Sequence, residues 1–105
     1  MTKYEVSFRP RARRDFMALY RYIAKRSSFK IAGGYILGIE RACQTLATFP
    51  ERGTALGGSH RDLRKMGFEH RVTILFRVLN DRVEILRILY GGRDIGPQLE
   101  RLKES

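Results

Sequence analysis

The sequence predicts an α+β fold in which a hairpin of two helices packs on a small antiparallel sheet. Two patterns support this prediction. Residues 71–79 alternate apolar side chains with a more polar set, which is the period-2 signature of a strand with two unlike faces. Residues 12–23 and 32–49 instead repeat apolar side chains at spacings of three and four, as one face of a helix requires. The predicted element order is β-α-α-β-β-β, followed by a short C-terminal helix or tail.

The composition indicates one globular domain over residues 1–105. An apolar fraction of 43% is ordinary for a folded protein, and a chain of this length buries roughly two thirds of its unfolded surface. No apolar run approaches the roughly 20 residues that span a bilayer, and the N-terminal residues lack the apolar core of a signal peptide. We therefore expect a cytoplasmic protein that makes no membrane contact.

Net charge is the strongest global clue to a partner. The 21 Lys and Arg residues exceed the 11 Asp and Glu residues, so the formal charge is +10. Solubility alone calls for a charge of roughly 2–8. A field of this sign attracts polyanions or an acidic partner protein and speeds encounter with either.

The N-terminal half is predicted to form one strand and two helices. Residues 3–9 alternate as a strand, and Pro10 suits the first turn of a helix because its missing N–H is not needed there. Ser27 or Ser28 can cap a second helix over residues 29–48, which Pro50 ends. The apolar stripes hold Ala12, Phe16, Leu19, Tyr20 and Ile23 in the first helix, and Ala32, Tyr35, Ile36, Ile39, Cys43, Leu46 and Phe49 in the second.

The C-terminal half is predicted to complete the sheet. Residues 50–60 form a loop, residues 61–66 a short strand, and the following two longer strands are joined at Asn80-Asp81, where both residues tolerate the positive φ of a tight turn. Pairing of residue 79 with residue 82 places Val83, Ile85 and Leu89 on the helix-covered face, together with Val72, Ile74, Phe76 and Val78. Beyond Gly91-Gly92, Asp94 can cap a short helix through Leu102.

The opposite face of the predicted hairpin is a mixed apolar and cationic surface, where we expect the function. By the same parity it carries Arg71, Arg77, Leu86, Ile88 and Tyr90, and Arg64 and Arg93 belong to the same region. Arginine's planar fork suits phosphates and carboxylates, and it stays charged when partly desolvated.

Other polar residues indicate no catalytic or metal chemistry. Arg87 falls by parity on the buried face, which requires either a β-bulge or an ion pair at the margin of the core. His60 and His70 have no cysteine or acidic partner at metal-ligand spacing. Cys43 lies within an apolar stripe and is expected to be a small core residue. We therefore expect no metal and no cofactor.

One ordered set of residues spans roughly positions 4–95. It runs through Asp15-Phe16, residues 20–24, Ala32 with Tyr35 and Ile39, Leu46, Phe49-Pro50, Gly53, Leu63-Arg64, residues 70–72, residues 75–78, residues 83–87 and residues 90–94. This set resembles the ParE branch of the RelE/ParE toxin superfamily, which are the toxins of type II toxin–antitoxin systems.

The resemblance implies a small cytoplasmic toxin that a neighbouring antitoxin holds inactive. In this family the antitoxin is a DNA-binding dimer whose extended C-terminal segment wraps the toxin, giving a hetero-oligomer. We expect a ParD-like antitoxin with an acidic C-terminal segment, since a basic toxin with an apolar groove suits an amphipathic segment that folds on binding. The resemblance places its helix in a groove by the helical hairpin, at Tyr20, Ile23, Tyr35 and Ile39.

The resemblance also implies two possible targets. ParE members poison DNA gyrase by binding, whereas RelE members cut messenger RNA in the ribosome with basic and tyrosine side chains and without metal. Three basic RelE positions match Arg64, Arg71 and Arg93. However, Asp62 stands where a lysine is expected and Leu99 where a tyrosine is expected, so a general acid–base group is missing from the match. The sequence favours gyrase inhibition through the arginine-bearing surface and the tail.

Two alternatives stay open. The first is a ribosome-dependent mRNA endoribonuclease of RelE type, in which Tyr90 replaces the absent tyrosine beside Arg64, Arg71 and Arg93. The second is a basic nucleic-acid-binding domain with no toxin role, whose binding to bulk DNA or RNA would depend strongly on salt.

Overall fold

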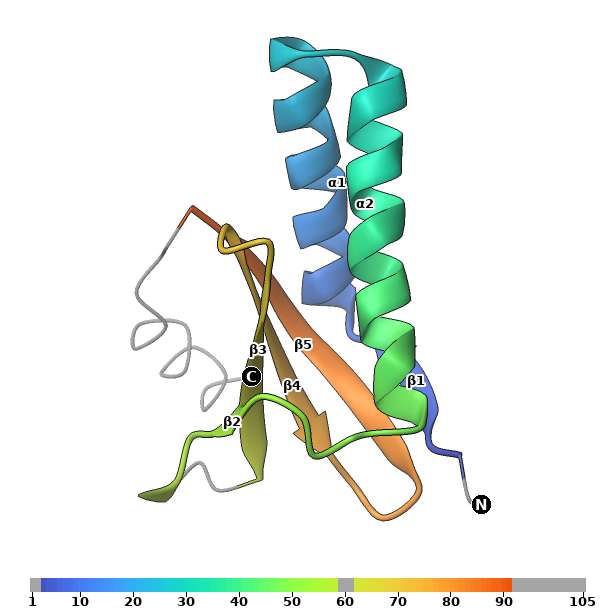
Figure 1. The fold of residues 1–105 in the computed structure, drawn as a ribbon, viewed down its shortest axis with the longest axis vertical. Coiled ribbons are helices and arrows are strands. Elements are labelled where there is room, and N and C mark those ends of the chain that lie inside the picture. The colour runs from blue at the N-terminus through green and yellow to red at the C-terminus, as the bar shows by residue number, and fades with distance from the viewer. Residues whose placement is uncertain (1–2, 59–61, 92–105) are drawn as a thin grey trace.

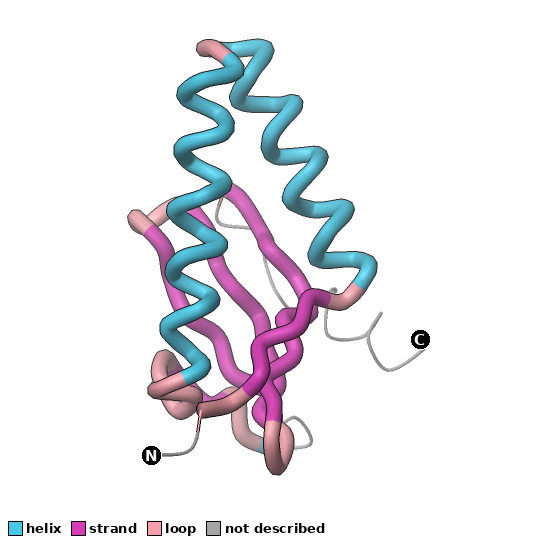
Figure 2. The backbone as a smooth tube through the Cα atoms, turned by 90° about the vertical axis from the view of Figure 1, so that its right-hand side faces the viewer, coloured by secondary structure: helices cyan, strands magenta, loops and turns pink. Residues whose placement is uncertain are grey.

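A computed structural model of the chain describes residues 3–58 and 62–91. Two helices stand against one side of a twisted sheet, and the turn between them lies beyond the end of the sheet (Figures 1 and 2). The elements are β1 (Glu5–Phe8), α1 (Pro10–Arg26), α2 (Phe29–Gln44), the 3₁₀ turn η1 (Thr45–Ala47), β2 (Thr54–Ala55), β3 (Leu63–Phe68), β4 (Val72–Val78) and β5 (Arg82–Tyr90). This confirms the predicted α+β class and element order, and it adds β2 within the segment that was predicted to be a loop.

The sheet has the strand order β1-β5-β4-β3-β2. Strands β2 to β5 pair antiparallel, but β1 lies parallel to β5, so the complete sheet is mixed. The β1 pairing covers only the first part of β5, from Arg82 to Ile85. Helix α1 contacts β5 as well. On the β1 side, no described strand pairs with the later part of β5. Helix α1 therefore meets the edge of the sheet there.

The helices begin as the sequence predicts. Pro10 is the first residue of α1, and the Ser28 side chain caps α2 by accepting a 3.1 Å hydrogen bond from the Ile31 N–H. Helix α2 ends at Gln44, earlier than predicted, because the chain tightens there into η1. The tighter turn rotates the following residues, and Phe49 is 63% exposed. Its assignment to the apolar stripe was wrong.

The main core lies between the helices and the sheet. Its fully buried members include Ile39, Cys43, Phe76 and Ile85. Burial raises the pKa of the Cys43 thiol to about 12, with a smaller contribution from Glu40, so this residue is a neutral, small core group as predicted. A second cluster, of Leu63, Leu75 and Leu86, lies apart from this core, and Leu56 packs on it. None of the described helices is long and apolar enough to cross a membrane.

A β-bulge in β5 changes which side chains face the helices. The register runs from Val78 opposite Val83 to Phe76 opposite Ile85, and then jumps to Leu75 opposite Arg87, so that Leu86 is one extra residue. Beyond the bulge the predicted parity is therefore reversed: Ile88 and Tyr90 pack with the helix-facing core. The prediction that these two residues share a face with Arg77 was wrong, whereas the Tyr90 side chain does reach Arg71 at the end of the sheet.

The two β-turns also differ from the prediction. Leu79 and Arg82 pair as expected, through a 2.8 Å bond from the Leu79 N–H to the Arg82 carbonyl. However, the only non-glycine residues with positive φ in the described ranges are Glu69 and His70, at 51° and 59°. They form the tight β3–β4 turn, which a 3.1 Å bond from the Arg71 N–H to the Phe68 carbonyl closes.

Helix α2 contacts the β3–β4 hairpin through an aromatic pair and a glycine. The Tyr35 and Phe68 rings meet edge to face with centroids 5.5 Å apart. A Cβ atom added at Gly38 would lie 3.1 Å from the Phe68 ring, so glycine allows the close approach at this point. These contacts fix the hairpin turn, and with it Arg71, relative to the helices.

Candidate functional site

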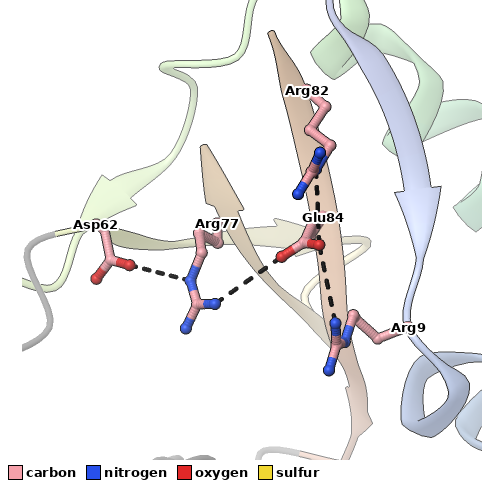
Figure 3. Close-up of polar contacts among 5 residues, drawn as sticks. All are labelled: Arg9, Asp62, Arg77, Arg82 and Glu84. Atoms are coloured by element: carbon pink, nitrogen blue, oxygen red, sulfur yellow. Dashed lines mark ion pairs between the residues drawn. The ribbon is translucent and has the colours of Figure 1, made fainter. Parts of the chain in front are cut away.

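At one end of the β4–β5 pair, arginines gather around carboxylates (Figure 3). Three guanidinium groups lie 3.8–3.9 Å from the Glu84 carboxylate, those of Arg9, Arg77 and Arg82. Arg77 also has its Nε 3.0 Å from Asp62 Oδ2, without the alignment of a hydrogen bond. The charge of Arg77 is thus largely compensated by its neighbours. We call this set of five residues the Glu84 network.

The Arg64 side chain holds a loop rather than facing a partner. Its Nε donates to the Arg52 carbonyl at 3.0 Å and its Nη2 to the Glu51 carbonyl at 2.6 Å. The loop backbone lies close against β3 here, because a Cβ on Gly53 (φ +74°) would collide with the Lys65 carbonyl oxygen. These bonds give Arg64 a structural role that its position in the sequence did not indicate.

At the other end of the β4–β5 pair, Arg71 is exposed and faces tyrosines. A side-chain hydrogen bond with Tyr90 raises the pKa of the Arg71 guanidinium above its ordinary value, and the charges of Tyr90, Tyr35 and Glu69 add to this. Arg71 is therefore a permanent cation at the end of the sheet. We call Arg71 with Tyr22, Tyr35 and Tyr90 the Arg71 cluster.

The three tyrosines of this cluster differ in environment. Burial raises the pKa of Tyr35, Glu69 and Tyr90 raise it further, and Arg71 opposes them. The Tyr35 hydroxyl is buried and has no hydrogen-bond partner among the described residues. Tyr22 of α1 lies beside Tyr90, with ring centroids 5.6 Å apart and a tilt of 58°. Tyr22 was not predicted as a site residue, although it directly precedes Ile23 of the apolar stripe.

Arg87 is buried and joins the sheet to α1. It forms a two-bond ion pair with Asp15, from Nε to Oδ2 at 2.8 Å and from Nη2 to Oδ1 at 3.0 Å, and the Ile88 N–H donates to the same Oδ2 at 2.9 Å. Both explanations offered for Arg87, a bulge and an ion pair, are therefore correct. Asp15 could not be predicted as the partner, since 72 positions separate the two residues.

An apolar groove runs along the helical hairpin. Two adjoining cavities of about 380 and 560 Å³ share Phe16 and Met17. They are lined by Phe16, Met17, Tyr20, Arg21 and Ile36, and by Val6, Phe8, Arg13, Phe16, Met17 and Glu40. Met17 is 56% exposed although it carries a large apolar side chain, and the sequence analysis overlooked it.

The groove contains only part of the predicted antitoxin contacts. Tyr20 lines it, whereas Ile39 is fully buried and Ile23 and Tyr35 pack against the core. The side chains of Leu86 and Ile88, each 4% exposed, are likewise unavailable to a partner. At both the predicted antitoxin groove and the predicted target surface, tertiary packing therefore leaves fewer of the predicted residues accessible to a partner.

A family model of the ParE toxin of type II toxin–antitoxin systems, parDE, matches residues 6–95. The chain belongs to this toxin family. The match covers all the elements described above except the first residue of β1, so the Arg71 cluster, the Glu84 network and the groove lie within the toxin fold. Comparison with curated proteins gave no match.

Solved structures share the toxin's fold. A chain of the chromosomal ParDE toxin–antitoxin system from P. aeruginosa aligns with a TM-score of 0.74 at 19% identity, covering 85% of this chain and 97% of its own. The toxin–antitoxin complex RelBE2 from Mycobacterium tuberculosis gives 0.61 at 23% identity, with 89% and 97% covered. The conserved hypothetical protein HP0894 from Helicobacter pylori gives 0.52 at 16% identity, with 83% and 93% covered.

Several predicted features of the toxin lie outside the described residues. They are Arg93, Leu99, His60 and the helix cap at Asp94. Within the described ranges no three His, Cys, Asp or Glu side chains gather as metal ligands would. Among the arginines predicted on the target surface, two therefore remain as possible contacts in the described residues. Arg77 has its charge balanced by neighbouring carboxylates, and Arg71 is exposed.

Proposed function

We propose that this toxin inhibits DNA gyrase by binding it, and that a ParD-like antitoxin neutralises the toxin in the cytoplasm. The observation that carries the proposal is the match of residues 6–95 to the ParE toxins. The P. aeruginosa relative in fold also comes from a ParDE system. Membership in the toxin family argues against a basic nucleic-acid-binding domain with no toxin role.

The geometry supports binding over RNA cleavage. Arg64 occupies a basic position of the RelE set, but its Nε and Nη2 donate to carbonyls of the 51–53 loop. Asp62, where the RelE set has a lysine, places a negative charge beside Arg77. A ribonuclease needs free cations at the scissile phosphate and a group that moves a proton, and these two positions supply neither.

The target interface is proposed at the Arg71 end of the sheet. Arg71 and Tyr90 offer an exposed guanidinium and a half-buried phenol there, and we propose Arg77 and Arg93, the latter outside the described residues, as further contacts. Leu86 and Ile88 support the surface from within. A cation held by phenols suits an anionic or carbonyl-rich protein surface.

The antitoxin is proposed to occupy the apolar groove along the helical hairpin. Phe16, Met17 and Tyr20 would receive the apolar face of an amphipathic helix, and Arg13 and Arg21 at its margins suit an acidic segment. The toxin and antitoxin would then form a hetero-oligomer in which the basic charge is neutralised.

Induced expression with parallel readouts tests the proposal. Gyrase inhibition predicts loss of DNA supercoiling, filamentation and a DNA-damage response while messenger RNA stays intact, and the purified chain should block supercoiling by gyrase in vitro. Co-expression of the antitoxin should abolish each effect. Intact supercoiling together with mRNA cuts in the first minutes would refute gyrase as the target.

One observation favours the ribonuclease as second candidate. The hydrogen bond between Arg71 and Tyr90 places a phenol beside a permanent cation, and a phenol can exchange a proton with a ribose hydroxyl or a leaving group. The same expression experiment decides, since Tyr90→Phe would then stop mRNA cleavage while keeping the aromatic ring. For gyrase inhibition, Tyr90→Phe should change toxicity far less than Arg71→Ala.

A further inference from the structure

A cavity of about 370 Å³ lies between α1 and the end of β5, apart from the groove along the hairpin. Its lining comes from Asp15, Ala18, Leu19 and Tyr22 of α1 and from Ile88, Tyr90 and Gly91 of the chain at and after β5. It lies past the point where β1 stops pairing with β5. A volume of this size falls in the range of sites for small planar ligands.

Two tyrosine rings form an aromatic corner in this cavity. Tyr22 and Tyr90 meet at a 58° tilt with centroids 5.6 Å apart. The Arg26 guanidinium lies 4.5 Å from the Tyr22 ring centroid, which holds the ring by a cation–π contact. Tyr22 is nevertheless 39% exposed. An exposed, braced aromatic ring beside a cation is the type of surface on which nucleobases stack.

The edge of β5 adds a hydrogen-bonding pattern to the cavity. The Ile88 N–H points away from β4, toward Asp15, whereas the Gly91 N–H points to the Arg71 carbonyl of β4. Because backbone groups alternate along a strand, the N–H and C=O of Tyr90 point to the same side as those of Ile88. A donor and an acceptor therefore stand side by side at the cavity, as the adjacent acceptor and donor on the edge of a base require.

The charge around the cavity is positive. Arg11, Arg14, Arg21 and Lys25 are exposed on α1, and their spacings of three, seven and four residues put them on one side of the helix with Ala18. Asp15 lines the cavity, but Arg87 and the Ile88 N–H bind its carboxylate. These four basic side chains thus form a row along α1 beside the pair of tyrosine rings.

We propose that this cavity binds one unstacked base of a single-stranded nucleic acid, with the sugar–phosphate chain following the basic side of α1. The base would stack in the corner of Tyr22 and Tyr90 and bond with the Tyr90 backbone, while Arg26 and Arg14 contact phosphates. The inference does not depend on gyrase as the target, because single-stranded DNA and RNA both carry such a base.

Fluorescence anisotropy with the full chain tests this proposal. The probes are labelled oligoadenylates of about ten nucleotides, as DNA and as RNA, and an abasic DNA of the same length, which has the same phosphates and no bases. Wild type should bind the intact DNA or RNA about tenfold more tightly than the abasic strand at equal salt, as loss of one stacked base predicts. The tighter of the two intact probes identifies the source of the base.

Variants then locate the contact. Tyr22→Ala should weaken binding of the intact probe about tenfold and leave the abasic probe unchanged, whereas Tyr22→Phe should keep wild-type affinity. Phe49→Ala is the control, since it removes an aromatic ring that is even more exposed than Tyr22 (63% against 39%) and lies outside the cavity. Equal binding of abasic and intact strands by wild type, or unchanged binding by a folded Tyr22→Ala protein, would overturn the proposal.

Discussion

The two ends of the β4–β5 pair surround arginine with different side chains, carboxylates at one end and tyrosines at the other. At the Glu84 network, Arg77 lies among carboxylates, with Asp62 at 3.0 Å and Glu84 at 3.9 Å. At the Arg71 cluster, six residues or about 20 Å along the chain, the guanidinium is exposed and bonds with the hydroxyl of Tyr90. Carboxylates cancel the charge of a cation, whereas a neutral phenol orients the cation and leaves its charge in place.

This difference shows how one residue type serves two purposes on the same sheet. The ion pairs around Glu84 are long, at 3.8–3.9 Å, and their arginines are partly exposed, so each pair adds little stability. At the Arg71 cluster the guanidinium is exposed at the end where β5 and the β3–β4 turn meet. A partner with negative or polar surface should therefore engage the Arg71 end first.

The largest expected effect concerns the ion pair that holds α1 beside the Arg71 cluster. Asp15→Ala leaves the buried Arg87 guanidinium and the Ile88 N–H without this acceptor, and should lower the free energy of unfolding by about 3 kcal/mol. Glu84→Ala at the other end should cost no more than about 1 kcal/mol. Urea unfolding measures both. Equal losses for the two variants would mean that the Arg87–Asp15 pair does not anchor the helix.

A smaller change in stability, but a clear difference in function, is expected for the arginines themselves. Arg71→Ala and Arg77→Ala should each change the free energy of unfolding by less than about 1 kcal/mol, because Arg71 is exposed and the ion pairs of the 35% exposed Arg77 are partly screened by solvent. Growth after induction at matched protein levels should recover strongly for Arg71→Ala and only slightly for Arg77→Ala. Full toxicity of a folded Arg71→Ala protein would contradict the proposed interface.

The smallest effect is expected at Tyr35, behind the Arg71 cluster. Tyr35→Phe removes a buried hydroxyl that no described group binds, so at pH 7 the unfolding free energy should stay within about 1 kcal/mol of wild type or rise. The folded-state pKa of Tyr35 is raised, so its contribution to stability is complete below the unfolded pKa of roughly 10 and is lost as pH rises through the folded pKa.

Thermal unfolding at pH 7 and above pH 10 checks this prediction. Wild type should lose more stability on the alkaline side than Tyr35→Phe does. The comparison isolates Tyr35 because both proteins retain Cys43, whose raised pKa acts in the same direction. The same alkaline loss in both proteins would assign the effect to other groups.

Local signals in the sequence were sufficient for most of the fold. Alternation in β4, proline at the start of α1 and serine before α2 each act within a few residues, and each produced the predicted element. The two-residue strand β2 was missed because Thr54-Ala55 is too short to show a period. The tight turn was assigned to Asn80-Asp81 rather than Glu69-His70 because Asn and Asp accept positive φ more readily than Glu does.

The candidate site was less predictable because long-range contacts decide it. Parity could not show whether Arg87 uses a bulge, an ion pair or both, since its partner Asp15 lies on α1. Arg64 looked like a free cation because the carbonyls that it binds belong to a loop without periodicity. Tyr22 became part of the site only when β5 brought Tyr90 beside it.

The extra residue at Leu86 has a consequence for how relatives of this toxin should be compared. Deleting it would restore a regular ladder with Ile88 still opposite Ile74 and Tyr90 still opposite Val72, so both side chains would keep facing the helices and the phenol would stay beside Tyr22. A bulge thus lets a strand take up one inserted residue while the side chains beyond it keep their faces. Alignments of such toxins should accordingly allow a single-residue gap near residues 85–87, even though gaps normally belong in loops.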